Sequence, residues 1–277
     1  MKLSIITVTF NSSPTLADTL SSVSSQDYPD IEYIVVDGGS TDSTLELVKS
    51  SSRVNRHISE PDEGIYDAMN KGLKLATGDV IGFLHSDDVY AHPGVLSLVT
   101  KRFEELDLDA LYGDVVYFQN SPGRLGGLGV GLGAGLGGEL GGEQGGELGG
   151  KIDVVRRYRS HRFAPNMIGW GWMPAHPSLF LKRGVYDTYG LFKTDYKIAG
   201  DYEFVARIFH ANLLKYHYLP EVLVKMRMGG VSTVGLSNSI ILNQEVLRAC
   251  RENGIPTNWF KILSKYPAKL LDSIFQK

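Results

Sequence analysis

The N-terminal third of the chain alternates short apolar runs with segments of helical periodicity. The three apolar runs cover residues 3–10, 31–36 and 80–84. Runs of this length, bounded by turn residues, are typical of strands that are buried on both faces of a parallel sheet. Between the first two runs, Leu16, Leu20 and Val23 recur at helical spacing, and another helix is expected to begin near Leu45.

A third helix is predicted just before the third strand. Ile65, Met69, Leu73 and Ala76 recur at the spacing of one helical face. Gly78 follows, and glycine often ends a helix in the left-handed conformation, so we expect it to act as the C-terminal cap.

The order of these elements predicts an α/β fold with a mostly parallel sheet flanked by helices. Strand–helix–strand units of this length form right-handed crossovers, so the carboxyl ends of the strands meet at one edge. Phe10, Asp37 and Asp87 directly follow or end the three strands. Ligands of open α/β sheets bind at this edge, which makes it the expected site.

Composition narrows the class of protein. The 277 residues include 43% hydrophobic residues, enough for one large α/β domain or two small ones. A formal net charge of −3 argues against general nucleic-acid binding, which needs a basic surface. Cys250 is the single cysteine, so neither an intrachain disulfide nor a thiolate metal cage is expected. With no signal-peptide layout and no membrane-spanning apolar run, we expect a cytoplasmic protein that is soluble or peripheral to a membrane.

The pair Asp87-Asp88 is the strongest candidate for chemistry at the expected edge. The chain has no Gly-x-Gly-x-x-Gly after the first strand and no phosphate-binding loop ending in Gly-Lys. Any bound phosphate would therefore be met by a metal, and two carboxylates suit a divalent cation such as Mn²⁺ or Mg²⁺. The alternative is that Ser86, Asp87 and Asp88 cap the next turn, since Pro93 and Gly94 follow shortly after.

Several motifs together carry a family resemblance. They are Thr7-Val-Thr-Phe-Asn11, Val36-Asp-Gly-Gly-Ser-Thr-Asp42, Gly64-Ile-Tyr-Asp-Ala-Met-Asn-Lys-Gly72, Gly78-Asp79, Phe83-Leu-His-Ser-Asp-Asp88, Tyr112-Gly-Asp114, His176-Pro-Ser-Leu-Phe180 and Gly200-Asp-Tyr-Glu203. The set resembles the family 2 nucleotide-sugar glycosyltransferases of bacterial polysaccharide biosynthesis. The resemblance implies the GT-A fold, a single domain, and inverting transfer of a sugar from a nucleoside-diphosphate donor, uridine diphosphate being expected, to a glycan or lipid-linked hydroxyl.

The resemblance also implies roles for individual residues. Asp201 would be the catalytic base, Asp37 would contact the nucleobase, and Asp87 and Asp88 would hold the metal. The further nucleotide-binding candidates are Thr7, Thr9, Asn11, Gly38, Asp67, Lys71, His85, Ser86 and Arg227. His85 stands where many relatives carry the first Asp of an Asp-x-Asp metal motif.

Three residues of the C-terminal half are acceptor-binding candidates, namely Trp172, His176 and Glu203. Aromatic faces suit sugar rings, but Trp is equally ordinary in a core. Asp201 itself has an alternative role, because an Asp before a helix often serves as its N-cap. Arg227 precedes Gly229-Gly230, which predicts either a loop that closes over the diphosphate or a plain linker.

We expect the chain to divide into four segments. These are a nucleotide-sugar-binding half at 1–120, a Gly-rich flexible loop or insertion at 121–150, an acceptor and catalytic half at 151–235, and a helical segment at 236–277. In the last segment Lys261, Lys265 and Lys269 recur at every fourth position. This spacing predicts either a basic face that contacts anionic lipid or a helix docked on the protein itself.

Two other functions remain open at this stage. A nucleotidyltransferase can use a similar sheet, although it would be expected to carry a Gly-rich basic turn in place of Thr9-Phe-Asn-Ser12. A nucleotide-sugar or glycan-binding module without turnover is the other alternative, and His85 is the residue that favours it.

Overall fold

The computed structural model describes residues 1–120, 152–229 and 236–266. The strands are β1 Leu3–Thr9, β2 Ile31–Asp37, β3 Arg56–Ser59, β4 Val80–Phe83, β5 Val89–Tyr90, β6 Ala110–Asn120, β7 Ile152–Tyr158, β8 Leu179–Lys182 and β9 Tyr216–Arg227. The α-helices are α1 Leu16–Ser24, α2 Thr44–Ser50, α3 Ile65–Leu75, α4 Val95–Leu106, α5 Arg183–Tyr189, α6 Gly200–His210 and α7 Leu236–Glu252. Short 3₁₀ helices are η1 Ser160–Arg162, η2 Pro165–Trp170 and η3 His176–Ser178.

All the described strands belong to one sheet, in the order β3-β2-β1-β4-β8-β6-β9-β5, with β7 paired to β6. The N-terminal half is parallel, because β1 pairs with both β2 and β4 and β2 pairs with β3. The antiparallel strand β8 then joins β4 to β6, and β6 pairs in parallel with β9. The predicted α/β fold with a mostly parallel sheet is therefore confirmed.

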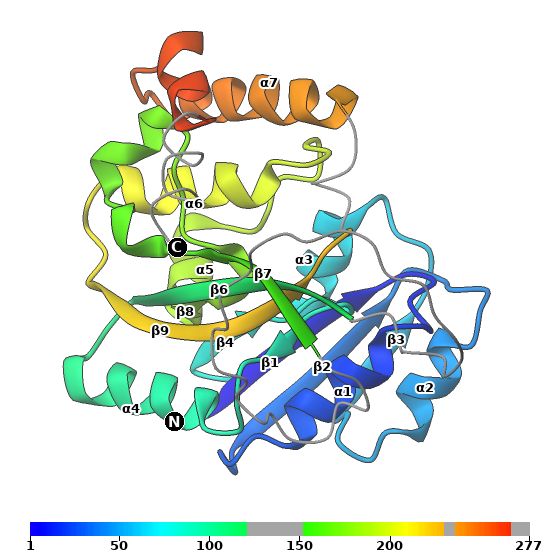
Figure 1. Ribbon diagram of the computed structural model, residues 1–277. Helices are drawn as coiled ribbons and strands as arrows, with labels where there is room; N and C mark the ends of the chain where they lie inside the picture. Colours follow the sequence, from blue (N-terminus) through cyan, green and yellow to red (C-terminus); the bar gives the residue numbers. More distant parts are fainter. Residues whose placement is uncertain (121–151, 230–235, 267–277) are drawn as a thin grey trace, which may run out of the picture.

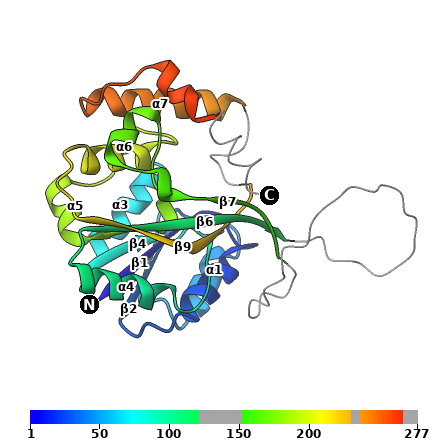
Figure 2. The same cartoon turned by 60° about the vertical axis from the view of Figure 1, so that its left-hand side comes forward.

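Helices cover both faces of this sheet (Figure 1). One face packs against α1 and α4, and the other against α3, α5 and α6, with α7 as the outermost layer (Figure 2). The alternation along β1 explains the two layers: Leu3 and Ile5 face the first core, while Ile6 and Val8 face the second.

The third helix forms as predicted, but two details of that prediction are wrong. Ile65 is 44% exposed, and the buried face of α3 is instead built on Tyr66, Met69 and Leu73. Gly78 does not adopt the left-handed conformation. A Cβ at Gly78 would lie 2.6 Å from the backbone nitrogen of Ser4, so glycine is needed there for close packing against β1.

Of the two alternatives predicted for the C-terminal lysines, the described residues fit a helix docked on the protein itself and not an outward basic face. Lys265 is 5% exposed, and the ammonium of Lys261 lies 3.3 Å from the carbonyl of Pro256 and over the ring of Trp170. The helix at residues 259–266 thus turns these lysines toward the protein. Lys269, Gly230 and the Gly-rich segment 121–150 lie outside the described residues. No helix in the described part of the chain has both the length and the apolarity that a membrane span requires.

The amino edge of the sheet is held by one buried carboxylate, that of Glu32 on β2. It accepts hydrogen bonds from the Ser4 hydroxyl at 2.6 Å, the Thr77 amide at 2.7 Å and the Lys2 ammonium at 3.1 Å. Burial alone would raise the pKa of Glu32, but the hydrogen bonds outweigh burial and lower it to about 2. Glu32 therefore ties the starts of β1 and β4 to β2.

We expect Glu32→Gln to lower the free energy of unfolding by about 2–3 kcal/mol at pH 7. Because the pKa is lower in the folded than in the unfolded protein, this stabilisation is complete above pH 4.5 and disappears as the pH falls to about 2. Denaturant unfolding at several pH values should show that the difference in free energy of unfolding between parent and variant decreases as the pH falls from 4.5 to about 2. Glu46→Gln, on the exposed side of α2, is the control and should change stability by less than about 0.5 kcal/mol.

Candidate active site

The loops that follow β1 and β2 are joined at the carboxyl edge of the sheet. Asn11 adopts a left-handed backbone, with φ of 47°, which Asn tolerates better than most residues. Its amide donates to the Ser40 hydroxyl at 2.7 Å, and its side-chain oxygen accepts from the Thr41 amide at 2.9 Å. Asn11 therefore holds the two loops together.

Asp37 organises the second of these loops from inside the protein. Its carboxylate is fully buried and accepts hydrogen bonds from the Ser40 amide at 3.1 Å and from the Ser59 hydroxyl at 2.6 Å, as well as from the Ser40 hydroxyl. Because Asp37 is fully buried, a nucleobase could contact it directly only if the surrounding chain moved. In this structure Asp37 fixes the backbone conformation of the turn that begins at Gly38.

Two residues without a role predicted from the sequence, Phe10 and Asp62, lie beside Gly38. A Cβ at Gly38 would lie 2.4 Å from a carboxylate oxygen of Asp62 and 3.5 Å from the ring of Phe10. Phe10 is 60% exposed, although it follows a buried strand. A large exposed aromatic ring beside a carboxylate is suited to a planar polar ligand. The signal was present in the sequence as an apolar residue that ends a strand run at the ligand edge.

The side-chain hydroxyl groups of the two threonines of β1 differ in whether they are free to bind a ligand. The Thr7 hydroxyl lies inside the sheet, 2.7 Å from the carbonyl of Leu84 and 3.0 Å from the Tyr33 hydroxyl. Thr9 stands beside Asp37 in the strand register, and its buried hydroxyl has no partner among the described residues. Of the two, Thr9 is the one with an unused polar group at the site edge.

Asp67 and Lys71 support the loop between β3 and α3. The Lys71 ammonium lies 3.0 Å from Glu60, 3.3 Å from Asp67 and 2.8 Å from the carbonyl of Pro61. The structure therefore places both residues against this loop, where they hold the chain that carries Asp62.

The turn after β4 presents one open carboxylate and one buried carboxylate. Asp87 is partly exposed and makes no hydrogen bond to the residues that the structure describes. Asp88 is 2% exposed, and its oxygen accepts from the Arg227 amide at 3.3 Å. Burial and the neighbouring charge of Asp87 raise the pKa of Asp88 well above its ordinary value. The Ser86 hydroxyl donates to Ser12 at 2.9 Å, which fixes this turn to the loop after β1.

His85 and His176 meet in the interior, beside the open carboxylate. Their rings are 5.9 Å apart and nearly parallel, and the Nδ1 atom of His85 is buried without a partner among the described residues. Burial lowers the pKa of both imidazoles, that of His176 to about 3. His176 also contacts the rings of Phe83 and Phe192, so the structure places it in an aromatic cluster.

Arg227 lies at the end of β9, close to the turn after β4. Its guanidinium donates to Asp18 of α1 at 2.7 Å and stacks over the ring of Phe118 at 4.8 Å. The arginine thus reaches the ligand edge through its backbone contact with Asp88 and anchors the end of β9 to α1.

Asp201 lies in the first turn of α6 and not at the N-cap position, which Ala199 occupies. Its carboxylate accepts from the Tyr202 amide at 2.7 Å and lies 3.5 Å from the Tyr66 hydroxyl. Burial raises the pKa of Asp201 to about 6, and the two hydrogen bonds oppose this only partly. A carboxyl group with this pKa is suited to accept a proton near neutral pH.

A chain of side-chain contacts connects Asp201 to the turn after β4. Tyr66 packs on Phe192 at 6.1 Å, Phe192 on His176 at 5.8 Å, and His176 on His85. The buried amide of Asn70 fixes Phe192 by pairing with both its carbonyl, at 2.8 Å, and its backbone nitrogen, at 3.0 Å. The two candidate chemical groups are therefore held by one rigid core.

None of the three acceptor-binding candidates faces an open surface. Glu203 is fully buried, 2.9 Å from Arg207 and 3.2 Å from Lys193, so its charge is neutralised inside the protein. Trp172 is 7% exposed, and the guanidinium of Arg162 lies over its ring. Together with the buried His176, these residues support the core of the C-terminal half in this structure.

The carboxylates after β4 fit a hard divalent cation. Asp87 offers free oxygen ligands, and a cation beside it would favour the ionised form of Asp88, which burial and the charge of Asp87 disfavour. Within residues 1–120, 152–229 and 236–266, no three His, Cys, Asp or Glu side chains gather closely enough to hold a metal by themselves. Water or substrate oxygens would have to complete its coordination, which is usual for Mg²⁺.

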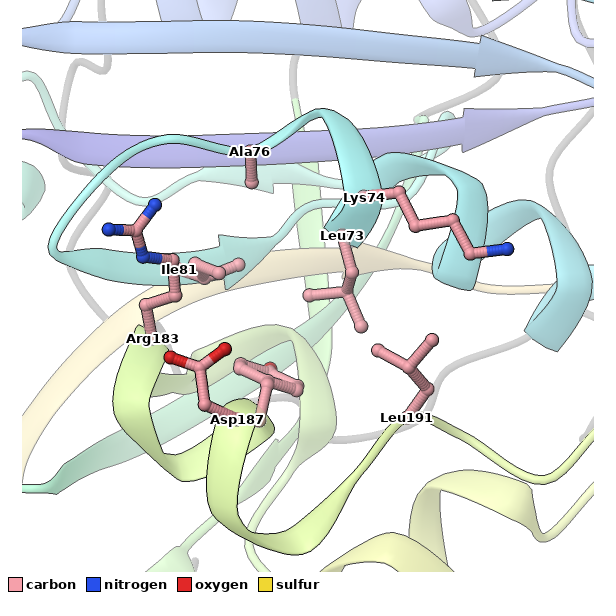
Figure 3. A pocket seen from close by; sticks show the side chains of 8 residues that line it. Leu73, Lys74, Ala76, Ile81, Arg183, Asp187 and Leu191 are labelled. Atoms are coloured by element: carbon pink, nitrogen blue, oxygen red, sulfur yellow. The ribbon is translucent and has the colours of Figure 1, made fainter.

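A separate cavity of about 300 Å³ lies between α3 and α5, beside the start of β4. Figure 3 shows Leu73 and Leu191 pointing into it, with Arg183 and Asp187 at its rim on α5. This cavity lies toward the amino edge of the sheet, whereas Asp37 and Asp87 lie at the carboxyl edge. We therefore place the candidate active site at the carboxyl edge.

Comparisons with known proteins identify the family of the chain. Residues 4–129 match the family model described as Glycosyl transferase family 2. A PGL/p-HBAD biosynthesis glycosyltransferase of Mycobacterium bovis (strain BCG / Pasteur 1173P2) is 30% identical over 244 residues, which cover 86% of this chain and 80% of that protein.

Similar solved structures share the fold at low sequence identity. S. aureus TarS 1-349 in complex with UDP-GlcNAc has a TM-score of 0.61 at 20% identity, covering 90% of this chain and 66% of that one. The mannosyltransferase PcManGT from Pyrobaculum calidifontis, in complex with GDP-Man and Mn²⁺, has a TM-score of 0.61 at 18% identity, covering 91% and 63%. This chain spans only 39% of the longer S. aureus TarS structure. These likenesses confirm the predicted GT-A-like fold.

The raised pKa of Asp201 makes stability depend on pH. Because the folded protein holds this proton up to about pH 6 and the unfolded chain only to 3.8, stability falls as the pH rises between these values. Asp201→Asn removes the charge from this site. We therefore expect it to raise the free energy of unfolding at pH 7.5 by about 1–3 kcal/mol, with a corresponding rise in melting temperature. The gain should shrink toward pH 4 in thermal scans. Asp187→Asn on the exposed side of α5 should show no such trend.

Proposed function

The chain belongs to glycosyl transferase family 2 and is a glycosyltransferase, and we propose that it transfers a sugar from a uridine-diphosphate donor to a hydroxyl of a glycan or lipid-linked acceptor, with inversion. The observation that carries this proposal is the position of Asp201. It places a carboxyl group with a pKa of about 6 at the start of α6, connected through Tyr66, Phe192 and His176 to the carboxylates after β4.

In the proposed reaction, Asp201 accepts the proton of the acceptor hydroxyl. The hydroxyl oxygen attacks the anomeric carbon from the face opposite the diphosphate, and the electrons of the breaking carbon–oxygen bond leave with the diphosphate. One displacement of this kind inverts the anomeric configuration. The raised pKa makes Asp201 a stronger base than an ordinary carboxylate while leaving it ionised above about pH 6.

At the other end of the site, we propose that Phe10, Gly38 and Asp62 receive the nucleobase. The exposed ring of Phe10 offers a stacking face, and Gly38, which has no Cβ, lets the Asp62 carboxylate lie close to the backbone near that ring. A divalent cation held by Asp87, with Asp88 behind it, would neutralise charge on the departing diphosphate. The uridine assignment is supported by the TarS complexes with UDP and UDP-GlcNAc, while the PcManGT complex with GDP-Man makes guanosine the competing outcome.

We expect Asp201→Asn to lower kcat/KM by roughly 10²-fold to 10⁴-fold, as is typical when a general base is lost. Donor affinity, measured by calorimetry with UDP-GlcNAc, UDP-glucose and GDP-mannose, should stay at the parental value. In the parent, kcat/KM should fall as the pH drops through about 6, because the base becomes protonated. Near-parental turnover of the Asn variant, or retention of configuration in the product, would overturn the role of Asp201.

Donor binding should depend on a divalent cation and on Asp87. Calorimetric titration of the nucleotide sugar is expected to show weaker binding after chelation, with recovery on adding Mn²⁺ or Mg²⁺. Asp87→Asn should bind the donor at least about 10-fold more weakly and lose most of the response to Mn²⁺. Asp187→Asn serves as the matched control and should behave like the parent. Equal donor affinity with and without chelator would refute the metal assignment.

A further inference from the structure

The chain that leads into α6 is held by a single carboxylate from another helix. Glu245, in the middle of α7, accepts hydrogen bonds from the amides of Lys197 at 2.8 Å, Ile198 at 2.9 Å and Ala199 at 2.8 Å. These three consecutive N–H groups converge on one side chain. Such a cluster of backbone donors is a strong anion site, and here the protein supplies the anion itself.

This arrangement satisfies one of the unpaired amides at the start of α6, that of Ala199. The first amides of a helix lack partners within the helix and are usually satisfied by a Ser, Thr, Asp or Asn at the N-cap. The N-cap of α6 is Ala199, which has no side chain that could do so. Glu245 satisfies the amide of Ala199 from a distance of 46 residues along the chain.

The same contact restricts where Asp201 can lie. Ala199 comes two residues before Asp201, and a Cβ at the intervening Gly200 would lie 2.7 Å from the ring of Tyr66. Gly200 is thus pressed against α3 on one side, while Glu245 holds the preceding amides from the side of α7. The Tyr66 hydroxyl completes the restraint by donating to the carbonyl of Ile198 at 2.6 Å.

We propose that Glu245 is a positioning residue for catalysis that fixes the start of α6. Its negative charge also favours the protonated form of Asp201 when the base takes up a proton. This inference rests on the proposed role of Asp201 as the base. Glu245 does not touch the reacting atoms, and it acts on them only through Asp201.

The charged groups around Asp201 support an electrostatic part in this role. Burial is the main cause of the raised pKa of Asp201, and the charge of Glu245 adds to it. The other ionisable group that faces Asp201 among the described residues is the Tyr66 hydroxyl of α3. On α6 itself, Glu203 is paired with Arg207 and with Lys193. In the chain that precedes α6, the side chain of Lys197 is exposed.

Two substitutions separate the charge of Glu245 from its hydrogen bonds. Glu245→Gln keeps one acceptor oxygen and the size of the side chain but removes the charge. We expect it to lower the pKa of Asp201 by at least about 0.5 unit. The acid limb of the kcat/KM profile should move to lower pH by the same amount. Glu245→Ala removes all three hydrogen bonds, and we expect it to reduce kcat at least about 10-fold with little change in the donor Kd.

The pKa of Asp201 should also be measured directly, by NMR titration of the ¹³C-labelled carboxyl group, because this readout does not depend on activity. Glu252→Gln is the matched control: it lies two turns further along the same side of α7, about 10 Å away by helical rise. Glu252 binds Lys193, Tyr196 and Arg248 and makes no contact with residues 197–199. The control can lower stability, but it should leave the pKa of Asp201 within about 0.2 unit.

The outcomes distinguish this inference from the proposed function. An unchanged Asp201 titration in Glu245→Gln, or an equal shift in Glu252→Gln, overturns the role of Glu245 even if Asp201→Asn is inactive. Full activity of Asp201→Asn overturns the proposed base instead. A shift confined to Glu245→Gln, together with loss of kcat in Glu245→Ala, supports the inference.

Discussion

The pairing of the Asn70 amide with the backbone of Phe192 determines how the two halves of the molecule meet. Asn70 is buried on α3, and it satisfies both the carbonyl and the amide of Phe192 as a neighbouring strand would. Phe192 is thereby placed among Tyr66, His176 and Phe204. One end of this cluster, Tyr66, contacts the base candidate, and the other reaches His85 in the turn that carries the metal candidates. Their relative positions therefore depend on a contact that touches neither.

The sequence predicted the parallel half of the sheet well because its signals are local. Each strand there is a short apolar run, each crossover has helical periodicity, and the polar residues at the strand ends had to converge. β3 was not predicted, because its residues Arg56–Ser59 are largely exposed and have no apolar pattern. The role of Gly78 was also misjudged, since close approach to Ser4 depends on a tertiary contact that the local sequence does not reveal.

The site could be located from the sequence but not resolved into roles. Motif positions pointed to Asp37, Asp87 and Asp201, and all three lie at strand or helix ends as expected. Whether such a side chain is exposed or buried depends on partners that lie far along the chain. Asp37, for example, accepts a hydrogen bond from the hydroxyl of Ser59. Glu245 carried no signal at all, because a single Glu on an amphipathic helix is indistinguishable from a solvated one until its partners are placed.

The position of β8 has a consequence for how the chain folds. β4 pairs with β1, which is made 77 residues earlier (Leu3 opposite Val80), but its other edge is covered only by β8, about a hundred residues later, and β6 needs the still later β9. During synthesis the N-terminal half therefore exposes a strand edge until residues 179–182 emerge, and the long 121–151 stretch must be spanned in the meantime. The entropy of closing a loop grows only logarithmically with its length, so this delay costs little equilibrium stability. Its cost is kinetic: the N-terminal half waits, with an unpaired edge, for the half that carries Asp201.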